Sequence, residues 1–184
     1  MKGVTALICS LLLALPVAAQ AAHYSVDQNS SSLGFSTTYQ GASFDGRFDH
    51  WTASIDFDPE HLDTSRADVT VDLASATTGE STRDSMLPSP EFFDTEHHPQ
   101  AHFVTHAFSR QGDTIIAEGT LELKGHSEPV TLTVDFAPDG QKATMAIKGK
   151  LERLSFGIGE GEYQDTSVIG ADVEVTAHLS LVAQ

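Results

Sequence analysis

Four histidines in one short segment are the residues of this chain whose spacing suggests metal chemistry. His97, His98, His102 and His106 follow the pattern H-H-x₃-H-x₃-H. On a helix, residues at i, i+4 and i+8 would share one side and could bind zinc or another divalent metal. The segment instead alternates as a strand does, and if Phe103 points inward, His102 and His106 point to solvent. The strand interpretation predicts no metal site, and a periplasmic metal-binding protein built on these histidines remains the alternative.

Two adjacent aromatic residues, Phe92 and Phe93, stand in a connecting segment, residues 74–100, that breaks the regular pattern of the chain. Such a pair is unusual there, because loops lie on the surface and carry polar residues. The two side chains either plug a core beneath the loop or cover an apolar ligand. Both roles are compatible if the plug also acts as a gate.

Arg83 and Asp84 lie in the same segment, and Arg153 follows much later. These charged groups could orient the polar head of a ligand, or Arg83 and Asp84 could pair with each other to hold the segment in place. The chain contains no G-x-S-x-G or H-E-x-x-H motif, and its one cysteine is Cys9. We therefore expect a protein that is not an enzyme.

The N-terminus is typical of a signal peptide. A basic start at Lys2 precedes an apolar run over residues 4–17, and Ala19-Gln20-Ala21 fits the A-x-A cleavage pattern. The run is short for a bilayer span, so a permanent anchor is the weaker alternative. We predict that residues 1–21 are removed, that residues 22–184 form one domain, and that the product is periplasmic or secreted without stable membrane insertion.

The composition excludes several partners. Ten Lys and Arg residues face 26 Asp and Glu residues, which gives a formal net charge of −16. Nucleic-acid binding needs clusters of Lys and Arg, and an acidic surface is repelled by anionic membranes. Removal of residues 1–21 takes away Cys9, so no disulfide is expected. The sequence leaves a homodimer open.

The rest of the chain alternates between apolar and polar residues, as strands with one dry face do. Short links with turn residues make neighbouring strands antiparallel, and about eight strands in one domain suggest an up-and-down barrel or a sandwich. We favour the barrel because closure removes exposed strand edges. A capping box from Thr77 to Glu80 predicts a short helix over residues 79–87, which Pro88 and Pro90 end. The alternating segments cover residues 33–39, 44–48, 55–58, 69–73, 102–107, 115–123, 130–136, 145–151 and 173–181.

Motifs spread over residues 22–184 resemble those of the YceI-like family. They are Thr78-Gly79, Arg83-Asp84, Leu87, Phe92-Phe93-Asp94, Pro99, Phe103, Gly119-Thr120-Leu121, Gly125, Arg153 and Phe156-Gly157. The resemblance implies a lipocalin-like antiparallel barrel with an elongated cavity. It further implies that the cavity holds a polyisoprenoid chain or a related amphiphile, such as a prenylated quinone or a fatty amide. No other cofactor is expected.

The resemblance and the inward parity of the strands together give a set of candidate ligand-binding residues. The pattern alone fits a filled core as well as a cavity, since small barrels often fill themselves. Gly46, Gly119 and Gly149 fall on the inward parity and favour open space. We expect non-covalent transport or storage of an apolar small molecule. The candidate residues are Phe35, Phe44, Arg83, Phe92, Phe93, Phe103, Phe136 and Phe156.

Overall fold

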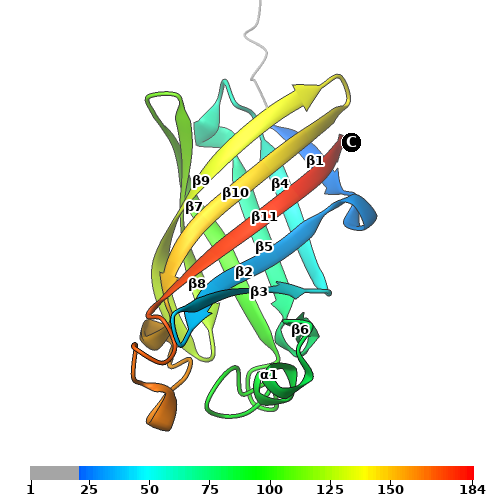
Figure 1. Cartoon of the computed structure of the whole chain (residues 1–184). Helices are drawn as coiled ribbons and strands as arrows, with labels where there is room; N and C mark the ends of the chain where they lie inside the picture. The colour runs from blue at the N-terminus through cyan, green and yellow to red at the C-terminus, as the bar shows by residue number, and fades with distance from the viewer. Residues whose placement is uncertain (1–20) are drawn as a thin grey trace, which may run out of the picture.

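The structure is a computed structural model that describes residues 21–184, in which strands make up most of the chain (Figure 1). The predicted signal peptide lies outside the described residues except for Ala21. The strands are β1 (Ala22–Val26), β2 (Ser32–Tyr39), β3 (Ala42–Phe48), β4 (Trp51–Phe57), β5 (Arg66–Asp72), β6 (Ala76–Thr77), β7 (Gln100–Gln111), β8 (Thr114–Leu123), β9 (His126–Asp139), β10 (Lys142–Glu152) and β11 (Asp172–Ala183).

Helical segments are few and short. Within residues 21–184, the single α-helix is α1 (Ser81–Met86), and none of the helices there is long and apolar enough to cross a membrane. In Figure 1, α1 lies at the lower end of the barrel, and the segments η4 and η5 lie at that same end. The 3-10 segments are η1 (Gln28–Ser30), η2 (Leu62–Thr64), η3 (Leu73–Ser75), η4 (Arg153–Phe156) and η5 (Gly161–Tyr163).

The strands close into an antiparallel barrel. Neighbours pair in the order β1-β4-β5-β7-β8-β9-β10-β11, and β11 pairs back to β1, which closes a ring of eight strands in the described part of the chain. Every pairing is antiparallel, as the short links predicted. The predicted fold class, an all-β antiparallel barrel with a short helical insertion, is confirmed.

The wall of the barrel forks at β11. Its C-terminal residues pair with β1, whereas its earlier residues, from Glu174 to His178, pair with β2. β2 pairs with β3, and β3 pairs with the short strand β6 through Arg47 and Phe48. The strands β2, β3 and β6 therefore extend the wall at the end where α1 lies. The alternating pattern had not identified β1, which is one of the two strands at this fork.

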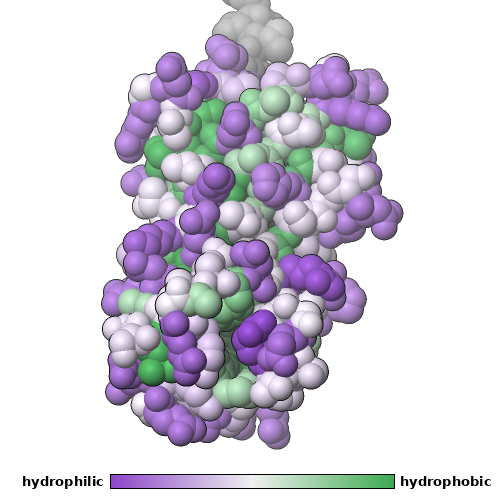
Figure 2. All heavy atoms as spheres, viewed as in Figure 1, coloured by the Kyte–Doolittle hydropathy of each residue, from purple (hydrophilic) through white to green (hydrophobic). Residues whose placement is uncertain are grey.

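Hairpin turns set the register of these pairs. Lys124 and Gly125 both have positive φ, 50° and 76°, and so do Gln40 and Gly41, at 50° and 80°. Two central residues of positive φ match the right-handed twist of the flanking strands. Each strand consequently keeps one face toward the interior. On the side shown in Figure 2, hydrophilic residues are spread over the outer surface, with pale and hydrophobic residues between them.

The short helix α1 begins differently from the prediction. The side chain of Glu80, and not that of Thr77, caps it by accepting hydrogen bonds from the backbone N–H groups of Thr82 and Arg83, both at 3.0 Å. These bonds favour the ionised form and lower the pKa of Glu80. The Thr77 hydroxyl donates instead to Asp84, so the predicted capping box is wrong.

Strand β7 contains a β-bulge between Thr105 and Ala107. The extra residue, His106, leaves both His106 and Ala107 exposed, while Thr105 and Phe108 are buried on either side. The bulge therefore shifts the alternation of β7 by one residue at its middle. Phe103 and Phe108, which would lie on opposite faces of a regular strand, both face the interior as a result.

Aromatic rings fill the end of the barrel opposite α1, which we call the filled end. The ring of Phe57 lies with its centroid 5.4 Å from that of Phe108 and 4.8 Å from that of Phe136. The ring centroids of Tyr24 and Phe136 are 5.8 Å apart. Phe57 is only 1% exposed, so this end is a packed core.

Candidate functional site

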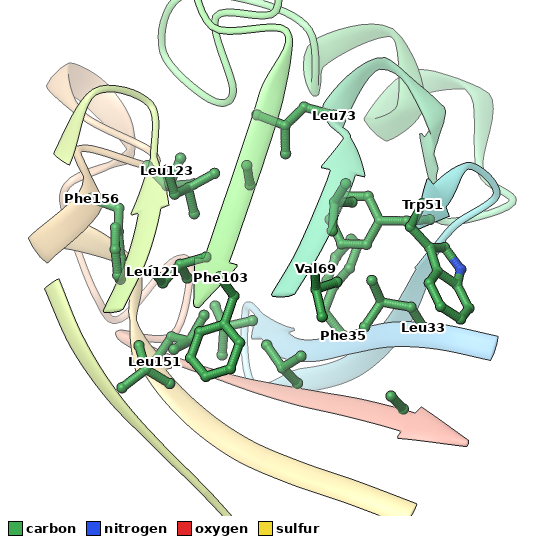
Figure 3. Close-up of a pocket in the computed structure, with 18 of the residues that line it drawn as sticks. Leu33, Phe35, Trp51, Val69, Leu73, Phe103, Leu121, Leu123, Leu151 and Phe156 are labelled. Carbon is green, nitrogen blue, oxygen red and sulfur yellow. The ribbon is translucent and has the colours of Figure 1, made fainter. Parts of the chain in front are cut away.

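The other half of the barrel is hollow. A cavity of about 490 Å³ extends from α1 toward the filled end, and we call its half of the barrel the hollow end. Almost all of its lining is apolar. The side chains that Figure 3 labels come from several strands and from η3 and η4, and they border this common space: Leu33, Phe35, Trp51, Val69, Leu73, Phe103, Leu121, Leu123, Leu151 and Phe156.

The cavity reaches the surface beside the β2–β3 hairpin and α1. Tyr39 and Thr82 belong to its lining and are exposed, Tyr39 to 42%. Glu80 and Arg83 line the same region. The polar side chains at this mouth contrast with the apolar walls deeper inside.

Most of the predicted ligand-binding residues lie in the cavity wall. The structure brings together Phe35, Phe44, Arg83, Phe92, Phe93, Phe103 and Phe156 around one space. Phe136 is the exception, and its prediction as a cavity residue is corrected. It points inward opposite Met145, but the rings of Tyr24 and Phe57 occupy the space in front of it. A strand residue that faces the interior can therefore border either the cavity or the packed core.

The three inward glycines do not themselves face open space, contrary to the prediction. A Cβ atom at Gly46 would lie 2.6 Å or less from two atoms of the Phe35 ring, and one at Gly119 would lie 2.6 Å from the Phe103 ring. A Cβ at Gly149 would likewise meet Leu132. These glycines let a neighbouring side chain lie flat against the wall, and that side chain then borders the cavity.

The adjacent aromatics Phe92 and Phe93 contact different parts of the protein. Phe93 is buried and packs against Phe48 with ring centroids 6.0 Å apart. Phe92 lies 5.1 Å from the ring of Tyr163, which belongs to η5. Both line the cavity, so the pair plugs a core and covers the space beneath it.

The loop that carries these aromatics is tied to the segment after η4. The carbonyl oxygen of Glu91 accepts hydrogen bonds from the backbone N–H groups of Gly159 at 2.7 Å and Glu160 at 3.3 Å. Lys124 donates to the carbonyl of Gly157 and lies 3.8 Å from the Glu160 carboxylate. Two loops far apart in sequence thus form one cover over the hollow end.

Arg153 holds the second of these loops from inside. It is 3% exposed, and its guanidinium donates to five backbone carbonyls at 2.8 to 2.9 Å, those of Ile158, Gly159, Tyr163, Ile169 and Gly170. Burial lowers the pKa of the guanidinium. Two of these carbonyls, those of Ile158 and Gly159, lie in the Gly-rich segment 157–161, so Arg153 holds that segment in place. With its donors committed to the loop, this arginine is not placed to bind a head group.

Arg83 and Asp84 make no ion pair with each other within residues 21–184. Asp84 accepts hydrogen bonds from the hydroxyls of Thr78 and Thr77, each at 2.7 Å, and from the N–H of Thr78 at 2.6 Å. The Thr78 hydroxyl, the Thr77 hydroxyl and the Thr78 N–H together lower the pKa of Asp84 to about 2. The Asp84 carboxylate therefore fixes the two threonines at the start of α1.

The Thr78 hydroxyl in turn positions Arg83. It accepts a hydrogen bond from Nε of Arg83 at 3.2 Å, and the guanidinium carbon stands 4.7 Å from the centroid of the Phe44 ring. In the described part of the chain, the two terminal nitrogens of Arg83 donate no hydrogen bond. Arg83 is therefore a preorganised cation at the mouth of an apolar cavity.

The histidines do not converge. His102 lies 2.8 Å from an Asp68 oxygen, and His106 lies 2.6 Å from the Thr120 hydroxyl. His97 contacts Asp94 at 2.9 Å, which raises the pKa of the histidine. Across residues 21–184, no three His, Cys, Asp or Glu side chains are grouped so that they could hold a metal ion. The strand interpretation of His102 and His106 as outward residues is confirmed.

Sequence reasoning missed part of the cavity wall. Val69 and Leu73 had been identified only as inward residues of a strand, and Trp51 had no assigned role. Tyr39 had been identified only as a residue of an alternating strand, and its bridge to Ile169 was not predicted. Tyr163 gave no signal, because its backbone carbonyl is held by Arg153. Their contribution to the site comes from the folding of the loop around Arg153.

The fold and cavity define a class: a closed antiparallel β-barrel that is packed at one end and hollow and apolar at the other. A family model described as a YceI-like domain matches residues 24–181, and the chain belongs to this family. A UPF0312 protein of Vibrio vulnificus is 31% identical over 177 residues, which cover 89% of this chain and 94% of that protein.

Solved structures share the same architecture. The crystal structure of Burkholderia cenocepacia BcnA is 29% identical, with a TM-score of 0.81 over 85% of this chain and 99% of that one. A polyisoprenoid binding domain from Saccharophagus degradans, implicated in plant cell wall breakdown, is 17% identical with a TM-score of 0.68, and the match covers 90% of this chain and 100% of that one. The second likeness concerns the fold.

Proposed function

We propose that this protein binds a long-chain apolar molecule, a polyisoprenoid or a prenylated quinone, without covalent attachment, and carries or stores it. The observation that carries the proposal is the cavity of about 490 Å³ with its apolar wall. Small-molecule sites typically occupy about 300–1,000 Å³. Each methylene group moved from water into such a wall contributes about 0.8 kcal/mol, so an apolar tail supplies most of the affinity.

The mouth suits the polar end of such a molecule. Arg83 is held by Thr78 on one side and by Phe44 on the other, and its terminal nitrogens are directed to no partner within the described residues. A hydroxyl, a carbonyl or a phosphate oxygen could accept from them. The polar atoms deeper in the wall are already satisfied: the Thr105 hydroxyl bonds the backbone of Ala67 at 2.8 and 3.2 Å. The tail therefore points inward and the head stays at α1.

The name of the Saccharophagus degradans neighbour supplies a candidate ligand class, and the apolar wall of this chain is chemically suited to it. We also propose that the protein is exported and acts as a binding protein, not an enzyme, in the periplasm or outside the cell. Intact-mass measurement of the exported product tests the cleavage after Ala21, and retention of Met1 in a membrane fraction would contradict it.

Native mass spectrometry of the purified protein, followed by solvent extraction, tests the binding function and reports the oligomeric state. We expect a co-purifying lipid of isoprenoid type. A variant that narrows the cavity, Val175→Phe, should retain much less of it, because Val175 lines the wall. The matched control is Glu174→Phe, which places the same ring on the exposed side of the same strand. Equal retention by both variants, or no lipid even after incubation with farnesol, would contradict the proposal.

A further inference from the structure

The cover over the hollow end consists of two loops that share few hydrogen bonds. We call residues 88–98 the aromatic loop and residues 157–170 the arginine-held loop. Within residues 21–184, the backbone hydrogen bonds between them end on one carbonyl, that of Glu91, which accepts from the N–H groups of Gly159 at 2.7 Å and Glu160 at 3.3 Å. Because both bonds share this acceptor, a movement of one carbonyl breaks them together.

The ring contact between the two loops borders the cavity. Phe92 of the aromatic loop and Tyr163 of the arginine-held loop lie with their ring centroids 5.1 Å apart, and both line the cavity. Neither residue is fully buried. Moving the two rings apart would therefore open the cavity to solvent along the junction between the loops.

The other borders of the mouth are held more firmly. The N–H of Gln40, in the turn of the β2–β3 hairpin, donates to the Val168 carbonyl at 2.7 Å, and the N–H of Gly170 donates to the Thr38 carbonyl at 2.9 Å. On another side, Asp84 fixes the start of α1 through its hydrogen bonds to two threonines. The junction between the loops is therefore the border at which the mouth widens most easily.

The aromatic loop is closed on itself and can move as one body. The N–H groups of Asp94 and Thr95 donate to the carbonyls of Ser89 at 2.9 Å and Pro88 at 3.1 Å, which brings the chain back to the start of the loop. Phe93 is buried beneath the loop and holds it to the core. Segments with few hydrogen bonds to the rest of a protein open locally at low free energy. A tilt of the loop about Phe93 breaks the junction and leaves the core packed.

We propose that the aromatic loop is a gate, which tilts about Phe93, separates Phe92 from Tyr163 and so admits and releases the ligand. The arginine-held loop stays in place, because Arg153 holds five of its carbonyls. The inference rests on the proposed function and adds the route by which the ligand reaches the cavity. Such a gate changes the rates of uptake and release by the same factor, and it leaves the Kd unchanged because the bound state is the same.

Joining the two loops across their junction tests the gate. Glu91 and Glu160 are both exposed, so the double variant Glu91→Cys with Glu160→Cys keeps the two rings, and Cys9→Ser removes the one natural thiol. A short bis-maleimide joins the new thiols, and N-ethylmaleimide, which caps them without a link, gives the matched control. Trp51, the one tryptophan of the chain, lines the cavity, so its fluorescence reports the uptake of geranylgeraniol by delipidated protein.

We expect the joined protein to take up and release geranylgeraniol at least about tenfold more slowly than the capped protein. Equal rates in the two proteins would overturn the gate and leave the binding function standing, because the ligand would then enter through the mouth as it is. If geranylgeraniol neither changes Trp51 fluorescence nor appears in native mass spectra of either protein, even after long incubation, the binding function itself is overturned.

The variant Tyr163→Leu tests the junction in the opposite direction. It removes the ring contact with Phe92 and keeps the position apolar, so uptake and release should both become faster, by a similar factor of roughly three or more. Tyr39→Leu is the matched control, the same change in the cavity lining on the hairpin side of the mouth, and should leave both rates nearly unchanged. Equal acceleration in both variants, or a weaker Kd in Tyr163→Leu with no faster uptake, would overturn the gate.

Discussion

The filled end and the hollow end of this barrel use the same kind of residue in opposite ways. At the filled end, Phe57 and Phe136 stack on each other and exclude space. At the hollow end, Phe35 lies over Gly46 and Phe103 lies over Gly119, so each ring is folded against the wall. Aromatic content alone does not decide whether a barrel is solid. A glycine on the facing strand decides it, because it lets the ring lie flat.

The largest expected effect is on stability, and it separates the two ends. Phe57→Ala should lower the free energy of unfolding by about 3–5 kcal/mol, because the ring is fully buried among other rings. Phe103→Ala should cost about 1–2 kcal/mol, because one side of that ring already borders open space and loses few contacts. Urea unfolding at neutral pH measures both. Equal losses would mean that the hollow end is packed like the filled end.

The next effect concerns the glycines of the hollow end. Gly46→Ala should push the Phe35 ring off the wall and into the cavity, since a Cβ atom at this position cannot coexist with the ring where it lies now. We expect a loss of about 1–3 kcal/mol from the overpacked wall and a larger loss of lipid retention. Gly112→Ala is not a suitable control because of its positive φ of 61°. The control is instead Ser36→Ala, at the residue that follows Phe35 in β2. Unchanged retention in Gly46→Ala would refute this account of the cavity.

A smaller effect appears only in acid. The pKa of Asp84 is lowered from 3.8 to about 2 in the folded protein, so its contribution to stability is fully present above pH 3.8 and is lost as the pH falls through about 2. Asp84→Asn should remove this contribution. The difference in unfolding free energy between the wild type and Asp84→Asn should therefore shrink between about pH 4 and pH 2. Urea midpoints across this range measure it. A wild-type advantage that stays constant with pH would contradict the role of the carboxylate.

The smallest effect is expected on the outer face of the wall. Replacing His102 and His106 together with Gln should change stability by no more than about 0.5 kcal/mol, because both side chains are on the solvent side. Lipid retention should not change, and zinc should not raise the melting temperature of the wild type. If zinc does raise it, and does not raise that of the double variant, these histidines bind metal.

The sequence was sufficient for most of the wall. Alternation fixes which side of a strand faces inward, and hence it identified Phe35, Phe44 and Phe103 as interior residues. It could not separate Phe136 from them, because the difference lies in the rings of Tyr24 and Phe57, which come from strands far away in sequence. Strand β1 was not predicted, since its five residues offer only Tyr24 and Val26 to the interior.

The loops at the hollow end were predicted less well than the strands, and for a physical reason. The glycines of residues 157–161 are typical of a flexible link when they are considered alone. Their carbonyls are ordered by Arg153, whose partners are backbone atoms and therefore carry no sequence signal. Arg83 shows the same difficulty. An ion pair with Asp84 was a reasonable expectation, but the Asp84 carboxylate accepts hydrogen bonds from the hydroxyls of Thr77 and Thr78 instead.

The pairing of β1 with β11 imposes an order on folding. Tyr24 pairs with Ala183 and Val26 pairs with Leu181, so the first strand of the described chain needs the last one before the ring can close. The hairpins from β7 to β11 join neighbours and can form early, whereas this seam spans almost the whole domain and must form late. Until residues 172–183 are available, β1 stays an unpaired edge on one side. A chain with this topology completes its barrel only after β11 has been synthesised, and the cavity exists only from that moment.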